Sequence, residues 1–290
     1  TALNRADLAQ REGNYPPPPG APPYPGLECA GTIRSVGENV IGWRPGQRVM
    51  ALLGGGGYAE RVAVPEETVM PVPDSLSLAE AAAIPEAWLT AYSNMIQIGR
   101  LAAGERVLIH AGASGVGSAA IQLAKWRGAT VWTTTSEGKV EQVKALGVDY
   151  VINYQETNFA DRIEETTGGE GVNLIIDFIG APYWQDNLRA LALWGRLVLV
   201  GLLGGAHADV NLGLFLAKKL SVHGSTLRDR TLEQKGQLVQ SFTRDVLPAF
   251  ADGTLHPVLD PRPFHLSEIA AAHHYMEENR NVGKIVVAVG

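Results

Sequence analysis

The part of the sequence that most constrains the fold is residues 106–128, RVLIHAGASGVGSAAIQLAKWRG. A short apolar run leads into Gly112, Gly115 and Gly117, and a pattern typical of a helix follows. Residues without a Cβ allow a tight turn that brings backbone amides close to a phosphate, and the helix N-terminus favours negative charge there. Ser114 stands where the G-x-G-x-x-G fingerprint has its middle glycine, so a tight turn without a ligand is the alternative.

Apolar runs and helical patterns alternate from residue 106 to residue 226. We expect strands at 106–110, 130–135, 149–153, 173–178, 196–201 and 220–225. Helical patterns lie between them, at 116–127, 137–146, 158–166, 183–193 and 211–219. Strands this apolar are buried on both faces, as in a parallel sheet that has helices on each side. Residues 90–226 are therefore predicted to form a doubly wound, six-stranded parallel sheet, and a glycine turn after its first strand favours a dinucleotide ligand.

The rest of the chain differs in composition and in its pattern of apolar residues. Residues 1–89 are rich in glycine and proline, with short apolar runs at 27–37, 47–53 and 58–65 that predict a compact β-rich unit. Residues 231–250 show a helical pattern, and 284–289 read as one strand. Because this tail is too small to fold alone, we expect it to pack on residues 1–89. The predicted domains are 1–89 with 227–290, and 90–226.

The end of the second expected strand bears on the choice of nucleotide. Enzymes that use NAD usually carry an acidic residue there, which binds the ribose 2′-hydroxyl. This chain has threonines and Ser136, followed by Lys139, and Tyr154 closes the next strand. Hydroxyl groups and a lysine can hold a 2′-phosphate that a carboxylate would repel, so we expect NADPH. Glu137 argues the other way, and a solvated Lys139 beside a half-buried Tyr154 is the alternative.

Composition excludes several classes of function. The net charge is −6, and no basic block indicates a nucleic acid or an acidic membrane as partner. No apolar run approaches the roughly 18 residues of a membrane span. The single cysteine, Cys29, allows no internal disulfide and suits a cytoplasmic protein. None of the seven histidines belongs to a cluster with metal-ligand spacing, so we predict no metal.

Five stretches carry a family resemblance, namely residues 2–20, 81–92, 108–125, 174–184 and 281–287. Together, and in this order, they resemble the quinone oxidoreductase branch of the zinc-free medium-chain dehydrogenases/reductases. The resemblance implies a Rossmann domain joined to a GroES-like catalytic domain, and a homodimer. Chains of that family start several strands earlier, so we expect part of the β-rich domain to lie outside this sequence. Zinc-dependent relatives have a cysteine ligand at Asn4 and a histidine ligand at Leu27, which supports the prediction of no metal.

The resemblance also implies a set of site residues. It places Asn4, Tyr15 and Thr90 at the nicotinamide end of the cofactor, and Gly115 and Val116 on the pyrophosphate. With Gly112, Ser114 and Gly117 of the glycine turn, the remaining predicted contacts are Ser136, Lys139 and Tyr154 on the 2′-phosphate, the backbone of Phe178, Ile179, Gly180, Gly201 and Leu202 along the cofactor cleft, and Asn281 from the tail.

The activity that follows is direct hydride transfer from NADPH to a quinone or another small electrophile. A quinone is a good hydride acceptor and needs mainly to be held over the nicotinamide. Tyr15 is the expected wall of the acceptor pocket and a donor to the quinone oxygen, with Asn4 beside it, while Asp7 orients Asn4 or caps a helix. The alternatives are an NADPH-dependent enoyl reductase acting on a C=C bond and a non-catalytic NADPH-binding protein. Residues 218–226 are expected to pair with their copy in a homodimer.

Overall fold

The computed structural model describes residues 1–290, and the chain divides into two compact units. Unit 1 contains Thr1–Thr90 and Leu227–Gly290, and unit 2 contains Ala91–Thr226. No helix is long and apolar enough to cross a membrane.

Unit 2 is built on the predicted doubly wound sheet, in which all six strands are parallel. The strand order is β6-β5-β4-β7-β8-β9, so the order reverses between β4 and β7, where folds of this kind bind their ligands. The strands are β4 (Arg106–Ile109), β5 (Thr130–Thr135), β6 (Tyr150–Asn153), β7 (Val172–Asp177), β8 (Leu191–Leu199) and β9 (Ser221–Gly224).

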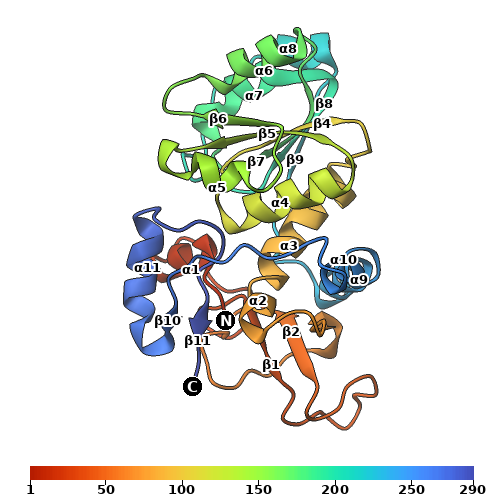
Figure 1. The fold of residues 1–290 in the computed structure, drawn as a ribbon, viewed down its shortest axis with the longest axis vertical. Helices are drawn as coiled ribbons and strands as arrows, with labels where there is room; N and C mark the ends of the chain where they lie inside the picture. Colours follow the sequence, from red (N-terminus) through yellow and green to blue (C-terminus); the bar gives the residue numbers. More distant parts are fainter. The chain divides into compact units, whose positions relative to one another are not determined.

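Helices cover both faces of this sheet (Figure 1). They are the π-helix η2 (Ser93–Ile98), α4 (Gly115–Trp126), the 3-10 helix η3 (Glu137–Lys139), α5 (Val140–Lys144), α6 (Phe159–Thr167), the 3-10 helix η4 (Ala181–Tyr183), α7 (Trp184–Ala190) and α8 (Leu212–Lys218). The hydrophobic core between β strands and helices includes Leu108, Trp132, Ile163, Ile175 and Leu197.

Two predicted helices of unit 2 have the wrong bounds. The helix expected at 183–193 ends at Ala190, because β8 begins at Leu191, which pairs with Val172 of β7. The pairing register shifts between Val172 and Leu174, and Trp194, whose φ is +62°, lies in the stretch of β8 between their partners Leu191 and Arg196. The helix expected at 137–146 is split into η3 and α5, since Lys139 leaves the helical conformation.

Unit 1 contains a three-stranded antiparallel sheet and a parallel pair of short strands from the tail. Its strands are β1 (Glu28–Thr32), β2 (Arg48–Leu52), β3 (Val69–Pro71), β10 (Phe264–His265) and β11 (Val287–Ala288). Its helices are α1 (Arg5–Arg11), η1 (Glu66–Thr68), α2 (Leu78–Ala81), α9 (Leu232–Asp245), α10 (Leu247–Ala251), η5 (Leu266–Glu268) and α11 (Ile269–Glu277), and α3 (Pro85–Tyr92) crosses the boundary between the units.

Three predictions for unit 1 were wrong in detail. Residues 58–65 form no strand, because Tyr58 turns its ring toward the core of the tail and bonds His273, and the third strand of the sheet is β3 instead. The helix expected at 231–250 breaks after Asp245, and a separate helix, α10, begins at Leu247 with Pro248 in its first turn. Of the strand expected at 284–289, only β11 pairs regularly.

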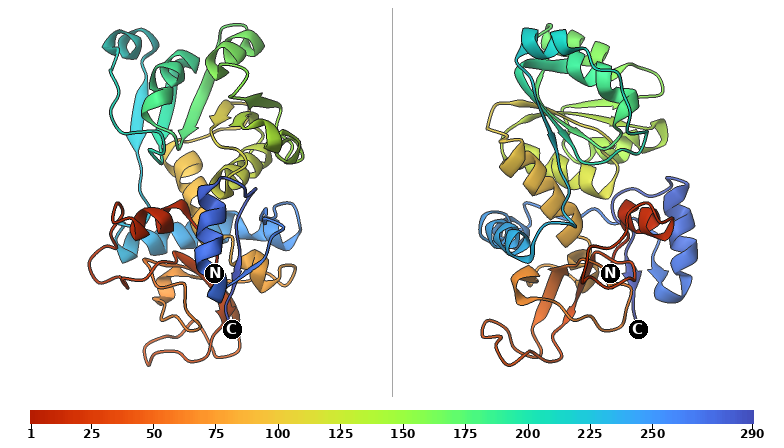
Figure 2. Two further views of the ribbon diagram at one scale, coloured as in Figure 1. Left: turned by 90° about the vertical axis from the view of Figure 1, so that its left-hand side faces the viewer. Right: turned by 180° about the vertical axis from the view of Figure 1, so that it is seen from behind.

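The tail returns to the N-terminal residues, as predicted. The Leu3 amide donates to the Ile285 carbonyl over 2.9 Å, and both side chains belong to one buried cluster with Leu8, Phe264 and Met276. The two ends of the chain lie close together in Figure 1, and α1 lies beside α11 in Figures 1 and 2. Unit 1 therefore depends on contacts between segments that are far apart in the sequence.

Candidate functional site

The turn between β4 and α4 has the geometry of an anion-binding site. Ser114 is the N-cap of α4, and its hydroxyl accepts a hydrogen bond from the Gly117 amide over 3.0 Å. The helix itself offers no partner to the amides of Gly115 and Val116, which are half-buried at its N-terminus. The residues of this turn therefore fit a phosphate, which these two amides can bind. The Ser114 hydroxyl already accepts the hydrogen bond from the Gly117 amide.

Two glycines of this turn are required by close packing. A Cβ on Gly117 would collide with the Ala111 carbonyl oxygen, and a Cβ on Gly112 would collide with the Thr133 hydroxyl. Both glycines are buried. Gly117 lets helix α4 approach the preceding turn, and Gly112 lets that turn pass close to Thr133. Together they set the position of the amides of Gly115 and Val116.

The residues predicted to hold a 2′-phosphate lie at the carboxyl ends of two neighbouring strands. Ser136 follows β5 and Tyr154 follows β6, and the Tyr154 amide donates to the Thr135 carbonyl over 3.2 Å. Lys139 closes η3 just beyond Ser136. The structure thus brings these three positions to one corner of the sheet, where Tyr154 is half-exposed and Glu137 is exposed.

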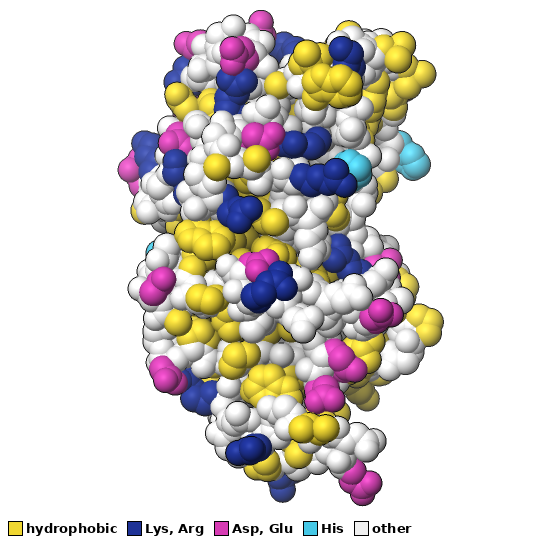
Figure 3. All heavy atoms as spheres, turned by 90° about the vertical axis from the view of Figure 1, so that its right-hand side faces the viewer, with side chains coloured by type: hydrophobic (Ala, Val, Ile, Leu, Met, Phe, Trp, Pro, Cys, Tyr) yellow, Lys and Arg dark blue, Asp and Glu magenta, His cyan; other side chains and the backbone are white.

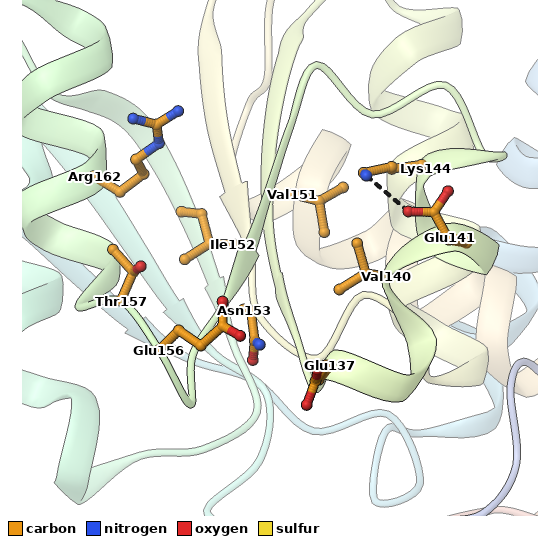
Figure 4. Close-up of a pocket in the computed structure, with 10 residues that line it drawn as sticks. All are labelled: Glu137, Val140, Glu141, Lys144, Val151, Ile152, Asn153, Glu156, Thr157 and Arg162. Carbon is orange, nitrogen blue, oxygen red and sulfur yellow. Dashed lines mark hydrogen bonds and ion pairs between the residues drawn. The ribbon is translucent and has the colours of Figure 1, made fainter.

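A hollow of about 540 Å³ lies beside this corner, at the outer edge of β6 (Figure 4). Val140 of α5 and Val151 of β6 point toward each other there. Its two cations already pair with carboxylates, Lys144 with Glu141 and Arg162 with Glu165. None of the predicted site residues lines it, and its paired cations do not favour an anion there.

The loops after β7 and β8, which contain further predicted cofactor residues, are hydrogen-bonded to each other. The Leu203 amide donates to the Phe178 carbonyl over 3.1 Å, and the Gly204 amide donates to the Ile179 carbonyl over 2.8 Å. Gly180 has a φ of +85°, and a Cβ there would lie 2.6 Å from the Gly205 carbonyl oxygen. Together with the turns after β4, β5 and β6, these loops place all the predicted cofactor residues of unit 2, Gly201 and Leu202 included, at the carboxyl edge of the sheet.

Asn4 lies in a buried charged network of unit 1. Its side-chain Nδ2 donates to the Glu28 carboxylate over 3.0 Å, and its side-chain Oδ1 accepts from the Lys284 ammonium over 2.6 Å. Lys284 and Glu28 form an ion pair over 2.6 Å, with side chains 5% and 0% exposed. The Asn4 side chain is therefore held at both ends by the protein. Sequence reasoning missed Glu28 and Lys284, although a charged residue inside each of the apolar runs LECAGT and VGKIVV was the available signal.

Asp7 caps helix α1, which was one of its two predicted roles. Its carboxylate accepts hydrogen bonds from the backbone amide of Asn4 over 2.8 Å and from the backbone amide of Gly26 over 2.9 Å. It is fully buried. Asp7 thereby fixes the backbone of Asn4 and ties it to the segment that leads into β1.

Tyr15 is held by an arginine that sequence reasoning did not identify. Arg228 is 3% exposed, and it donates to the Tyr15 carbonyl over 3.0 Å, to the Gly54 carbonyl over 2.9 Å and to the Gln10 side chain over 2.6 Å. Its guanidinium lies 5.2 Å from the centre of the Tyr15 ring. Burial raises the pKa of the Tyr15 hydroxyl, so this half-buried phenol keeps its proton at neutral pH.

Thr90 and Asn281 are the other two predicted site residues of unit 1. Thr90 is buried on α3, and Asn281 donates from its side chain to the Gly283 carbonyl over 2.9 Å in the turn before Lys284. Asn281 therefore stands only three residues from the lysine that holds Asn4.

The side chains of unit 1 do not fit a catalytic metal. Leu27 is 1% exposed and offers no donor atom, and Asn4 is engaged by Glu28 and Lys284. No group of three histidine, cysteine, aspartate or glutamate side chains is arranged to hold a metal ion.

Glu86 should make stability depend on pH. Burial, and then the charge of Glu28, raise the pKa of its carboxyl from 4.5 to about 8. The native state thus keeps a proton that the unfolded chain releases, and stability should fall as the pH rises between those two values. The free energy of unfolding of Glu86→Gln and of the wild type can be measured in urea between about pH 5 and pH 8.5. Because the variant has no carboxyl group to titrate there, its stability relative to the wild type should increase as the pH rises. The exposed control Glu233→Gln should follow the wild-type profile. A difference between Glu86→Gln and the wild type that did not change with pH would contradict the assignment.

Comparisons with known proteins agree with this architecture. Residues 1–74 match the model of the alcohol dehydrogenase GroES-like domain, and residues 115–242 match that of the zinc-binding dehydrogenases. One of the polypeptides of the phenolphthiocerol/phthiocerol polyketide synthase of Mycobacterium tuberculosis is 36% identical over 99% of this chain, which spans only 13% of that protein.

Two solved structures are similar over nearly their whole length. The quinone oxidoreductase of Pseudomonas syringae pv. Tomato DC3000 has a TM-score of 0.86 and 30% identity, covering 99% of this chain and 88% of that one. The CurK enoyl reductase has a TM-score of 0.85 and 30% identity, covering 100% and 88%. The chain therefore belongs to the medium-chain dehydrogenases/reductases, oxidoreductases whose fold binds a nicotinamide cofactor, and it resembles their quinone oxidoreductase type.

Proposed function

We propose that this protein reduces quinones by direct hydride transfer from NADPH, without a metal. The observation that supports the proposal lies in unit 1, where Arg228 fixes a protonated phenol, Tyr15. Asn4 and the buried Leu27 stand at the positions where zinc-dependent relatives have metal ligands. A quinone is electrophilic enough to accept a hydride without a Lewis acid, so a hydrogen-bond donor and a shaped pocket are sufficient.

Unit 2 supplies the cofactor side in this proposal. The amides of Gly115 and Val116 bind the pyrophosphate, and Ser136, Lys139 and Tyr154 bind the 2′-phosphate. When bound, the reduced nicotinamide supplies the hydride. Of unit 1, Thr90 and Asn281 contact the nicotinamide end.

The residues of unit 1 have separate tasks. Tyr15 donates a hydrogen bond to the quinone oxygen, where negative charge develops as the ring accepts the hydride. Asn4 helps to form the same side of the pocket, where the Glu28–Lys284 network holds it in place. Its side-chain amide bonds Glu28 and Lys284. The proton that completes the hydroquinone comes from water.

The acceptor is tested by the loss of reduced-nicotinamide absorbance with an ortho-quinone, in the presence of a chelator. We expect turnover with NADPH that the chelator leaves unchanged and that Tyr15→Phe lowers by about tenfold, the loss of one hydrogen bond to a charged oxygen. Tyr24→Phe, at a side chain that is 69% exposed, is the matched control. Full turnover by Tyr15→Phe would remove the phenol from the reaction, and no turnover by protein that binds NADPH would refute the quinone as substrate.

An enoyl reductase is the second candidate, and two of the similar proteins support it. The polyketide synthase relative matches over nearly all of this chain, and the CurK structure is an enoyl reductase. In that reaction the hydride goes to the β-carbon of a C=C bond conjugated to a carbonyl, and a proton goes to the α-carbon. Turnover of an enoyl thioester but not of the quinone, in the same assay, would select this activity.

Lys139 should set the preference for NADPH over NADH. Its ammonium would pair with the 2′-phosphate, an interaction that NADH lacks. We expect Lys139→Ala to raise the KM for NADPH about tenfold and to leave the KM for NADH unchanged, as steady-state kinetics with both cofactors would show. Lys144→Ala, whose ammonium pairs with Glu141, is the control. An unchanged ratio of the two KM values in Lys139→Ala would exclude this lysine from the nucleotide site.

We also propose a homodimer that pairs the β9 edge of unit 2 with its copy. Strand β9 ends the sheet, so its outer backbone groups have no neighbouring strand. Leu212 and Leu216 of α8 are 70% and 82% exposed, and the space-filling view shows hydrophobic side chains on the surface of unit 2 (Figure 3). Light scattering should give twice the 31.0 kDa of one chain, and the mass of one chain would refute the dimer.

A further inference from the structure

A line of buried polar side chains crosses unit 2 beneath the glycine turn. The Asn187 amide donates to Asp177 over 3.0 Å, and its oxygen lies 2.8 Å from His110 Nε2. His110 Nδ1 lies 3.0 Å from the Thr134 hydroxyl. All four side chains are between 0% and 1% exposed. Buried polar groups are costly unless each finds a partner, and in this line each does.

The partners fix the direction of the hydrogen bonds. The Ala111 amide donates to the Thr134 hydroxyl over 3.2 Å, so that hydroxyl can donate onward to His110 Nδ1. His110 then carries its proton on Nε2 and donates to Asn187, which donates to the Asp177 carboxylate. Burial lowers the pKa of His110 to about 4, which keeps its ring neutral, as this arrangement requires. The line therefore runs in one direction from a backbone amide to a carboxylate.

The two ends of the line hold two different loops. At one end, Thr134 binds the Ala111 amide with its hydroxyl and the Gly112 amide with its carbonyl, the latter over 2.9 Å. At the other end, the Asp177 carboxylate accepts from the Ile179 amide over 2.7 Å and from the Gly180 amide over 3.3 Å. These loops follow β4 and β7, the two strands between which the strand order reverses.

We propose that Thr134, His110, Asn187 and Asp177 act as one set of positioning residues that holds the glycine turn and the 178–180 loop in the geometry that binds the dinucleotide. None of the four needs to touch the cofactor. The inference rests on the proposed function, because it takes the carboxyl edge of unit 2 as the NADPH site.

Their packing leaves little freedom for another arrangement. The His110 ring contacts Phe159 edge-on and Tyr183 at a tilt, each with ring centres 4.7 Å apart. The Phe159 and Tyr183 rings also contact each other, with centres 4.9 Å apart, so the His110 ring packs against an aromatic pair. Close packing restricts its rotamers, so we expect loss of a hydrogen bond on either side of the ring to move a loop. The line should therefore respond as a unit.

The test compares NADPH affinity in variants at both ends of the line. Thr134→Val has the same shape as threonine but no hydroxyl, and Thr134→Ser keeps the hydroxyl. At about pH 7.5, titration of nicotinamide fluorescence should show a Kd for NADPH raised about fivefold to tenfold in Thr134→Val and within about twofold of the wild type in Thr134→Ser. Thr166→Val, which loses a bond from Trp132 elsewhere in unit 2, should bind as the wild type does.

The second measurement separates a connected line from local damage. Asn187→Leu breaks the line beyond His110, and the double variant with Thr134→Val should bind NADPH no more weakly than the weaker single variant. Additive losses in the double variant, or equal affinities of Thr134→Val and the wild type, would overturn the proposal. If Thr134→Val does not fold, Asn187→Leu alone decides: the Gly112 amide should exchange its hydrogen faster than in the wild type, and unchanged exchange would overturn it. A wild type that failed to bind NADPH would refute the proposed function itself, which is a separate outcome.

Discussion

The close approach of helix α4 to the turn after β4 determines where the amides of Gly115 and Val116 lie. Gly117 permits it, since any side chain there would meet the Ala111 carbonyl, and Gly112 permits the turn to pass Thr133. Ser114 then caps the helix through the Gly117 amide, which leaves the amides of Gly115 and Val116 for a ligand. The anion site is thus a consequence of packing, and the other loops of unit 2 reach the same edge because its strands are parallel.

Unit 1 depends in a comparable way on one buried ion pair. Lys284 donates to the Leu3 carbonyl, to Asn4 and to Glu28, so one ammonium joins the tail, the N-terminal segment and β1. The second Glu28 oxygen accepts from the Glu86 amide over 2.8 Å, which adds α3 to the same network. Burying a charge requires partners of this quality, and loss of one would leave the other uncompensated. The network explains why Asn4 has a fixed place beside the proposed acceptor side.

Local patterns predicted the elements of unit 2 well and those of unit 1 less well. The bounds of β5 were predicted to the residue, because TVWTTT is a run of β-branched and aromatic residues in a buried strand. Residues 58–65 show similar local chemistry, yet Tyr58 is drawn toward His273, which lies 215 positions later in the chain. The residues near Leu191 were predicted as the end of a helix, and their pairing with β7 makes them the start of a strand.

The site shows the same division. The glycines of the turn could be found because their need for a missing Cβ is local, and their neighbours at the strand ends followed from the parallel sheet. Arg228 and Lys284 could not be found this way, because Tyr15 and Asn4, which they hold, are more than 200 residues away in sequence. His110 and Asn187 look like ordinary residues of a strand end and a helix, and only the fold aligns them with Asp177.

The central claim is that a nicotinamide dinucleotide binds at the carboxyl edge of the unit 2 sheet. Hydrogen–deuterium exchange with and without NADPH tests it most directly, because it reports on each loop separately. The account predicts slower exchange in the segments around Gly115, Ser136 and Ile179, with the outer β6 hollow unchanged. Protection confined to that hollow, or no protection in the glycine turn, would contradict it.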